Sequence, residues 1–178
     1  RVRRQRQMCI RDRTGVLNKK TMEKRVSLML KNRGDKYVIF YMVDLDNFKN
    51  VNDTLGHIYG DQAIVETAQC LNKVFANQDC IGRLGGDEFA VCVSYQAFDE
   101  QGLLEFIGKK AQEICAGNRR TYTDNAASVS ITSSIGVAYA PDMGDSFTEL
   151  YTQADCALYY SKANGKDQYH IYSPKDDN

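Results

Sequence analysis

Residues 37–46 read Tyr-Val-Ile-Phe-Tyr-Met-Val-Asp-Leu-Asp, an apolar run that ends in two carboxylates. An uninterrupted apolar run of this length is typical of a strand that is covered on both faces. We therefore predict a buried strand that delivers Asp44 and Asp46 at its carboxyl end. Carboxylates at the end of a buried strand indicate a polar site at the edge of a sheet.

Residues 47–53 follow this strand with helical spacing. The backbone N–H groups near Asn47 and Phe48 would then lie at a helix N-terminus, where anions are favoured. Donors for a phosphate group would thus lie beside carboxylates for a cation. For Asp46 and Asp53 the pattern leaves two alternatives open. Each carboxylate could belong to the acidic site, or it could simply cap a helix.

A second acidic stretch reads Leu-Gly-Gly-Asp-Glu-Phe-Ala over residues 84–90. The residues on each side, 80–83 and 89–93, alternate well enough to be paired strands, and a Gly85-Gly86 link is a favoured hairpin turn. Glycines also let a large ligand lie against bare backbone. The alternative is a surface hairpin whose two carboxylates are merely solvated.

Asp44 and Asp87 together resemble the ligand set that Mg²⁺ prefers, one or two carboxylates plus substrate phosphate oxygens. Burying two or three carboxylates without a cation would cost several kcal/mol through repulsion and desolvation. The sequence therefore predicts a Mg²⁺ (or Mn²⁺) site that binds a nucleotide.

The remaining pattern predicts an α/β fold of the α+β sandwich type, with a central, largely antiparallel sheet flanked by helices. Tyr122–Ser128 is polar and is predicted to be a loop. The predicted helices are 18–32, 47–55, 60–76, 99–117 and 146–164, and the predicted strands are 37–44, a hairpin over 80–94, 129–140 and 168–172.

The composition fits one domain of ordinary size, with 178 residues and 23 basic residues against 23 acidic ones. With zero net charge, the chain has no overall electrostatic attraction for nucleic acid. No apolar run is long enough to cross a bilayer. Six cysteines without a Cys-x-x-Cys pair indicate reduced core residues in a cytoplasmic protein. Only two histidines are available, which leaves little for a histidine metal centre.

Several separated blocks of the chain resemble the GGDEF domain, the catalytic module of diguanylate cyclases. This resemblance implies a fold similar to the palm of nucleotide cyclases and polymerases. It also implies condensation of two GTP molecules into cyclic di-GMP and pyrophosphate, with one GTP on each subunit of a homodimer. The matching blocks are residues 44–53, 56–61, 83–89, 134–137, 154–159 and 162–166.

The resemblance implies a role for each matching site residue. Asp44, Asp87 and the Leu45 carbonyl would hold the metal, and Glu88 would assist metal binding or deprotonate the attacking 3′-hydroxyl. The catalytic residues would then be Asp87, Glu88 and Lys162. The GTP-binding residues would be Asn47, Phe48, Lys49, Asn52, Asp61, Gly85, Gly86, Lys162 and Lys166.

Asn52 and Asp61 match the pair that reads the guanine base. A carboxylate accepts from N1–H and the exocyclic amine of guanine, so Asp61 favours GTP over ATP. Lys162 and Lys166 lie four residues apart, on one face of a helix, and match positions that meet the triphosphate. The second position is usually arginine in this family, so we expect a weaker hold on phosphate here. Without the resemblance, a solvated helix end would explain both lysines.

Two segments depart from the family pattern. The inhibitory product-binding motif Arg-x-x-Asp corresponds to Ala76-Asn77-Gln78-Asp79, which lacks the arginine, so we expect weak or absent product inhibition. Residues 1–13 are rich in arginine and read as a basic linker, a tag or an artefact, with a nucleic-acid-binding arm as the alternative. The domain itself is predicted over 14–174, with a polar tail at 175–178.

Catalytic modules of this family are usually fused to sensory domains, so we expect one outside this chain. The resemblance also implies that a membrane-anchored sensor could carry this chain as its cytoplasmic part. A rival hypothesis is a catalytically silent module that binds GTP or relays dimerisation to a fused domain. Intact Asp87, Glu88 and Lys162 favour the enzyme.

Overall fold

The computed structural model describes residues 15–75 and 80–177, which form a mixed α+β fold. Within these residues a seven-stranded sheet runs in the order β1-β3-β4-β2-β6-β5, with β7 also paired to β6. The β1/β3 and β6/β7 pairs are parallel and the other pairs are antiparallel, so the sheet is largely antiparallel, as the sequence predicts. The predictions for residues 1–13 and for Ala76–Asp79 lie outside the described residues.

The strands are β1 (Leu17–Asn18), β2 (Tyr37–Asp46), β3 (Cys80–Gly85), β4 (Glu88–Tyr95), β5 (Arg120–Thr123), β6 (Ser128–Ala140) and β7 (Tyr169–Ile171). The helices are α2 (Lys19–Lys31), α3 (Phe48–Leu55), α4 (His57–Val74), α5 (Glu100–Asn118) and α6 (Phe147–Ala163), followed by the 3₁₀ helix η1 (Pro174–Asp177). Among these residues no helix has both the length and the apolar character that a membrane span requires.

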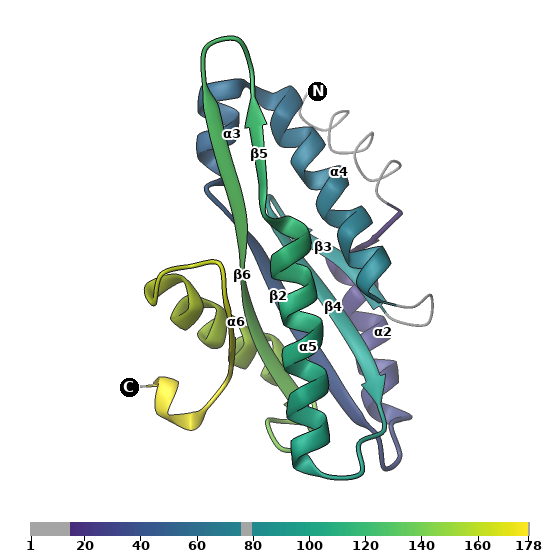
Figure 1. The fold of residues 1–178 in the computed structure, drawn as a ribbon. Coiled ribbons are helices and arrows are strands. Elements are labelled where there is room, and N and C mark those ends of the chain that lie inside the picture. Colours follow the sequence, from purple (N-terminus) through teal and green to yellow (C-terminus); the bar gives the residue numbers. More distant parts are fainter. Residues whose placement is uncertain (1–14, 76–79, 178) are drawn as a thin grey trace.

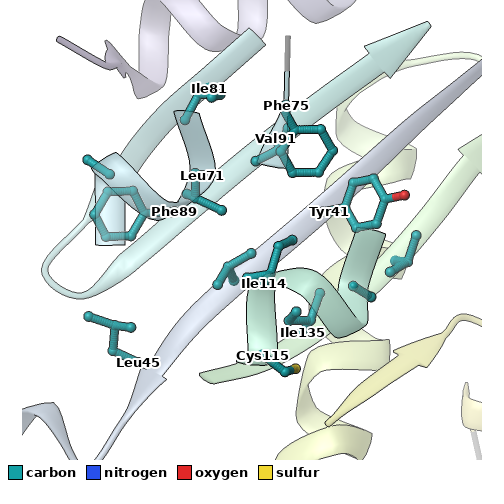
Figure 2. Close-up of a cluster of buried hydrophobic side chains, with 14 of the residues drawn as sticks. Tyr41, Leu45, Leu71, Phe75, Ile81, Phe89, Val91, Ile114, Cys115 and Ile135 are labelled. Atoms are coloured by element: carbon teal, nitrogen blue, oxygen red, sulfur yellow. The ribbon is translucent and has the colours of Figure 1, made fainter. Parts of the chain in front are cut away.

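β2 lies at the centre of the sheet, between β4 and β6 (Figure 1). Its side chains alternate between two cores. Tyr41 and Leu45 belong to the core under α4 and α5, which Figure 2 shows with Ile114 of α5 close by. Phe40 and Met42 belong to the core under α2 and α6. Covering both faces explains why the strand reads as one apolar run.

Helix α6 packs directly against the backbone of β6. A Cβ added to Gly136 would overlap the carbonyl oxygen of Ala154 and the backbone of Leu158, so only glycine allows this approach. The first turn of α6 is closed by a capping box between Ser146 and Glu149. These contacts fix where the opposite, C-terminal end of α6 lies.

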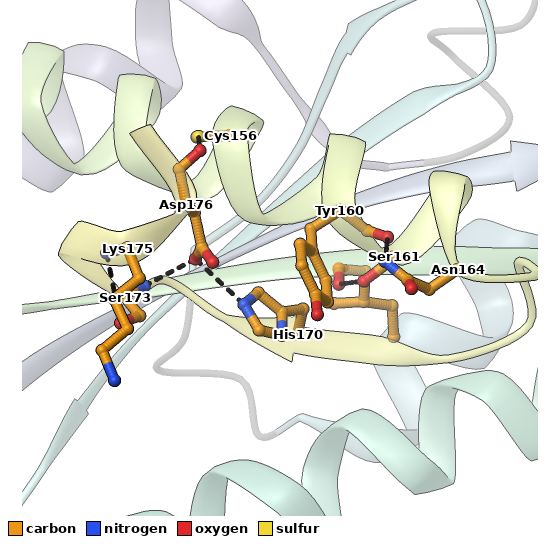
Figure 3. Close-up of polar contacts among 9 residues, drawn as sticks. Cys156, Tyr160, Ser161, Asn164, His170, Ser173, Lys175 and Asp176 are labelled. Atoms are coloured by element: carbon orange, nitrogen blue, oxygen red, sulfur yellow. Dashed lines mark hydrogen bonds and ion pairs between the residues drawn. The ribbon is translucent and has the colours of Figure 1, made fainter. Parts of the chain in front are cut away.

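The segment after β7 folds back along α6 (Figure 3). His170 stacks on Tyr160 with ring centroids 4.1 Å apart, and its Nε2 lies 2.9 Å from Oδ2 of Asp176. The thiol of Cys156 donates to the Asp176 carbonyl over 3.5 Å. The tail predicted at 175–178 therefore begins inside η1, which is tied to the domain.

The sequence-based prediction differs from the structure at β1, which it leaves out, at β5 and at the start of α4. The loop predicted at Tyr122–Ser128 is wrong at both ends, because Tyr122 and Thr123 belong to β5 and Ser128 is the first residue of β6. The hydroxyl groups of Thr121 and Ser130 hydrogen-bond across these strands. Because these paired side chains are polar, the sequence of the strand resembles that of a loop. α4 begins at His57, three residues before the predicted start.

Candidate active site

The end of β2 forms the floor of the candidate site. Asp44 and Asp46 point to the α6 side of the sheet, because they continue the alternation of Phe40 and Met42. Both carboxylates are buried, with 8% and 3% of their surface exposed. Neither Asp46 nor Asp53 caps a helix, so the capping alternative is wrong for both: Asp46 lies within β2 and Asp53 lies exposed in α3.

The β3–β4 turn places a second carboxylate beside this floor. Gly86 and Asp87 are the two turn residues, rather than the Gly85-Gly86 pair that the sequence predicts, and Gly86 has a φ of 40°. The guanidinium of Arg83 donates to the Gly86 carbonyl and braces the turn. The Leu45 N–H donates to the Asp87 carbonyl over 3.4 Å, so the turn is tied to the end of β2.

Glu88 is the first residue of β4 and lies opposite Asp44 in the antiparallel register. Burial raises the pKa of Asp44 to about 6; the charges of Asp87 and Glu88 also raise it, and the ion pair with Lys162 lowers it. The charges of Asp87 and Glu88 thus disfavour the ionised form of Asp44. A divalent cation would relieve this repulsion.

The chain turns from β2 into α3 at one residue. Asn47 has the left-handed backbone conformation, with a φ of 62°, and its side chain makes no capping bond to α3. The first N–H groups of α3, which begins at Phe48, therefore have no side-chain acceptor from Asn47. This arrangement matches the predicted helix N-terminus beside the carboxylates.

Two lysines close the site from the end of α6. The ammonium of Lys162 lies 2.9 Å from Oδ1 of Asp44. Lys166 follows in the loop after α6, so the prediction that both lysines lie on one face of a helix is wrong. Its ammonium donates to Oδ1 of Asn47 over 3.4 Å. α6 is held in place here by Ser161, whose hydroxyl donates to the Ile135 carbonyl on β6 over 2.8 Å.

These groups surround a cleft of about 480 Å³. Its size and its mixed charge suit part of a nucleotide triphosphate. Asn50 and Asp53 are lining residues to which the sequence analysis gave no GTP-binding role, although their spacing on one helix could have indicated it. The lining residues are Asp44, Leu45, Asp46, Asn47, Phe48, Lys49, Asn50, Asp53, Asp87, Lys162 and Lys166.

Five of the predicted site residues do not belong to the lining of this cleft: Gly85, Gly86, Glu88, Asn52 and Asp61. The first three belong to the β3–β4 hairpin, Asn52 lies on α3 and Asp61 lies on α4. Their roles stay predictions.

The amide of Asn52 is held on both sides. Its Nδ2 donates to the Phe48 carbonyl over 3.3 Å, and its Oδ1 lies 2.9 Å from Nδ1 of His57. A Cβ added to Gly60 would overlap this amide, so α4 passes closely behind it. His57 thus hydrogen-bonds at the start of α4.

Over residues 15–75 and 80–177, no three His, Cys, Asp or Glu side chains form a group arranged to hold a metal ion. The donors near the end of β2 nevertheless fit Mg²⁺ chemically. They offer carboxylate oxygens from Asp44 and Asp87 and the carbonyl oxygen of Leu45, which are hard ligands. Substrate phosphate oxygens would complete such a set.

The profile described as "Diguanylate cyclase, GGDEF domain" matches residues 11–168. The chain belongs to the GGDEF family. The chain is 32% identical to the probable diguanylate cyclase DgcC of Escherichia coli, over 89% of this chain and 42% of that protein. It is also 30% identical to the cyclic di-GMP phosphodiesterase PdeR of Escherichia coli, over 91% of this chain and 24% of that protein. The chain thus spans less than half the length of these relatives.

Solved GGDEF structures share the fold. The GGDEF domain of PA1120 (TpbB or YfiN) from Pseudomonas aeruginosa has a TM-score of 0.83 at 28% identity, covering 93% of this chain and 95% of that one. The coiled coil and GGDEF domain of DgcB from Caulobacter crescentus, solved with c-di-GMP, has a TM-score of 0.75 at 26% identity, covering 96% and 91%. The predicted palm-like α+β fold is confirmed.

Proposed function

We propose that this GGDEF domain is an active diguanylate cyclase. It condenses two GTP into cyclic di-GMP and pyrophosphate, with Mg²⁺ or Mn²⁺, as a homodimer in the cytoplasm, and it serves as the output domain of a larger signalling protein. The observation that carries the proposal is the cleft in which Asp44 and Asp87 face Lys162, Lys166 and the N-terminus of α3. Acidic and basic groups are thus brought together from four separate elements.

Each group has a task in this reaction. Asp44, Asp87 and the Leu45 carbonyl would hold the cation, which supplies positive charge beside the triphosphate when bound. Lys162 and Lys166 would donate to phosphate oxygens, and their charge would stabilise the departing pyrophosphate.

Glu88 lies at the start of β4, opposite Asp44. It would accept the proton of the attacking 3′-hydroxyl or support the cation. Asn52 and Asp61 would select guanine by hydrogen bonds that adenine cannot match. Because one domain would hold one GTP, the second substrate would come from the facing subunit.

The decisive experiment incubates the purified domain with GTP and Mg²⁺ and identifies the product by mass spectrometry. Asp87→Asn and Glu88→Gln remove the two carboxylates at the hairpin with little change in shape, and Glu23→Gln on the exposed side of α2 is the matched control. We expect cyclic di-GMP from the wild type and the control and none from the two variants.

The second candidate is a silent GTP-binding module that regulates a fused domain. It is favoured by the similarity to a relative named as a phosphodiesterase, of which the chain spans 24%. A wild-type domain that binds GTP but makes no cyclic di-GMP, even when dimerisation is forced by a fused coiled coil, would establish this alternative.

A further inference from the structure

Asp46 is a buried carboxylate with no task in the reaction described above. Its Oδ2 accepts from the hydroxyl of Thr132 over 2.7 Å, and its Oδ1 accepts from the hydroxyl of Ser134 over 2.8 Å. Both hydroxyl groups belong to β6, and Thr132 lies directly opposite Asp46 in the register. These two bonds fasten the carboxylate to the sheet.

A third donor comes from the loop after α6. The Asp167 N–H donates to Oδ2 of Asp46 over 3.2 Å. Asp46 therefore connects the end of β2 to the loop between α6 and β7.

This loop is held in an uncommon backbone conformation. Lys166 and Asp167 have φ values of 62° and 49°, in the left-handed region that side chains other than glycine rarely adopt. Such conformations persist only where surrounding contacts enforce them. The other contacts are the bond from the Lys166 N–H to the Ser161 carbonyl, over 3.1 Å, and the ion pair between Arg119 and Asp167, over 2.7 Å.

The loop determines where the ammonium of Lys166 lies, which is 3.4 Å from Oδ1 of Asn47 in the lining of the cleft. We propose that Asp46 is a positioning residue: its carboxylate holds the Lys166–Asp167 loop so that Lys166 faces the triphosphate. This inference rests on the GTP binding of the proposed function. It does not depend on turnover.

A rival role for Asp46 is that of a cation ligand beside Asp44. The hydrogen bonds argue against it, since three donors already occupy the two oxygens. Asp46→Asn separates the two roles. An amide oxygen in the Oδ2 position keeps the bonds from Thr132 and Asp167, and the Ser134 hydroxyl can turn to accept from the amide N–H. A positioning role survives this change, whereas a cation ligand loses its charge.

The test measures the dissociation constant of a non-hydrolysable GTP analogue with Mg²⁺ by titration calorimetry. We expect Asp46→Ala and Lys166→Ala each to weaken binding about tenfold, the scale of one hydrogen bond to a charged group. The double variant should be no weaker than Lys166→Ala alone, because the lysine that Asp46 positions is then absent. Asp46→Asn should bind like the wild type.

The matched control is Ser130→Ala, also on β6, whose hydroxyl pairs with that of Thr121 and makes no bond to Asp46. It should bind the analogue within about twofold of the wild type. If the domain turns over GTP, Asp46→Ala should lower kcat/KM for GTP by about the same factor as Lys166→Ala, because both changes weaken the same contact to phosphate. Thermal unfolding of each variant verifies the fold. Asp46→Ser, too short to reach the loop, replaces Asp46→Ala if the latter does not fold.

The proposal is overturned if Asp46→Ala binds the analogue as tightly as the wild type, if the losses of the two single variants add in the double variant, or if Asp46→Asn is as weak as Asp46→Ala. A wild type that binds the analogue but makes no cyclic di-GMP contradicts the proposed cyclase, and the binding comparison still decides the role of Asp46. A wild type that binds no analogue overturns both.

Discussion

The ammonium of Lys162 lies 2.9 Å from Oδ1 of Asp44 and joins the last turn of α6 to the end of β2. The pair is only partly exposed, with 37% of the lysine side chain and 11% of the aspartate side chain accessible. The lysine offsets part of the charge that Asp87 and Glu88 place around Asp44. The offset is incomplete, because the pKa of Asp44 is still raised to about 6.

This raised pKa predicts that Asp44→Asn stabilises the domain in the absence of divalent cations. The ordinary pKa is 3.8, so the folded state binds more protons than the unfolded chain between this value and about 6. The free energy of unfolding of the wild type therefore falls as the pH rises through that window. At about pH 7.5 the variant should be more stable by on the order of 1 kcal/mol, and near pH 3 the difference should disappear.

Urea unfolding in the presence of a chelator at the two pH values measures this difference. Asp35→Asn, on the exposed turn before β2, changes the net charge equally and should show no such effect. A variant less stable than the wild type at the higher pH would contradict the prediction.

Gly136→Ala should destabilise the domain strongly. The added methyl group would overlap the backbone of α6 at Ala154 and Leu158, and neither can move without shifting the helix. We expect a loss of about 3 kcal/mol or more in the free energy of unfolding, measured in urea.

Gly108→Ala in α5 is the matched control for this change. There the new methyl group would meet only the hydroxyl end of Tyr169, at 2.8 Å, which can turn away. The higher helix propensity of alanine offsets part of that cost, by about 1 kcal/mol. Equal losses in the free energy of unfolding for the two variants would contradict the close packing of α6 against Gly136.

His57→Ala should weaken the preference for GTP over ATP. Nδ1 of His57 lies 2.9 Å from Oδ1 of Asn52, and without it the amide can rotate away from the orientation in which we propose that Asn52 reads the base. Competition of each nucleotide with a fluorescent GTP analogue should show a loss of roughly fivefold to tenfold in GTP affinity and little change for ATP. Thr54→Ala on the exposed side of α3 is the control, and an equal loss for both nucleotides would refute this role of His57.

Product inhibition should be weak, because Ala76 stands where the family motif has arginine. Cyclic di-GMP in the submicromolar range should leave the initial rate unchanged, and Ala76→Arg should introduce inhibition by restoring a charged, planar donor near Asp79. Initial rates over a series of product concentrations measure both. Submicromolar inhibition of the wild type that Asp79→Ala abolishes would contradict this prediction.

The sequence predicts the central strand and its neighbours well, because β2 is covered on both faces and every position carries an apolar side chain up to Asp44. It fails for β5, where hydroxyl groups pair across the strands at Thr121 and Ser130 and also at Thr123 and Ser128. A strand whose stabilising pairs are polar has the composition of a loop.

The surroundings of Asp46 could not be predicted from local pattern. Its partners Thr132, Ser134 and Asp167 lie 86, 88 and 121 residues away in the chain. A short carboxylate before a helix resembles a cap when only its neighbours in sequence are considered. The sheet register, which places β6 beside β2, instead brings Thr132 opposite Asp46.

The alternation along β2 also limits which insertions and deletions the domain can accept. One residue added between Phe40 and Asp44 would turn both carboxylates toward the α4/α5 core and would turn Leu45 toward Lys162. Two added residues would keep the faces and would lengthen the strand by roughly 7 Å, moving the carboxylates away from the hairpin. The number of residues between Phe40 and Asp44 should therefore tolerate no change, whereas the surface loops of the same chain can vary in length.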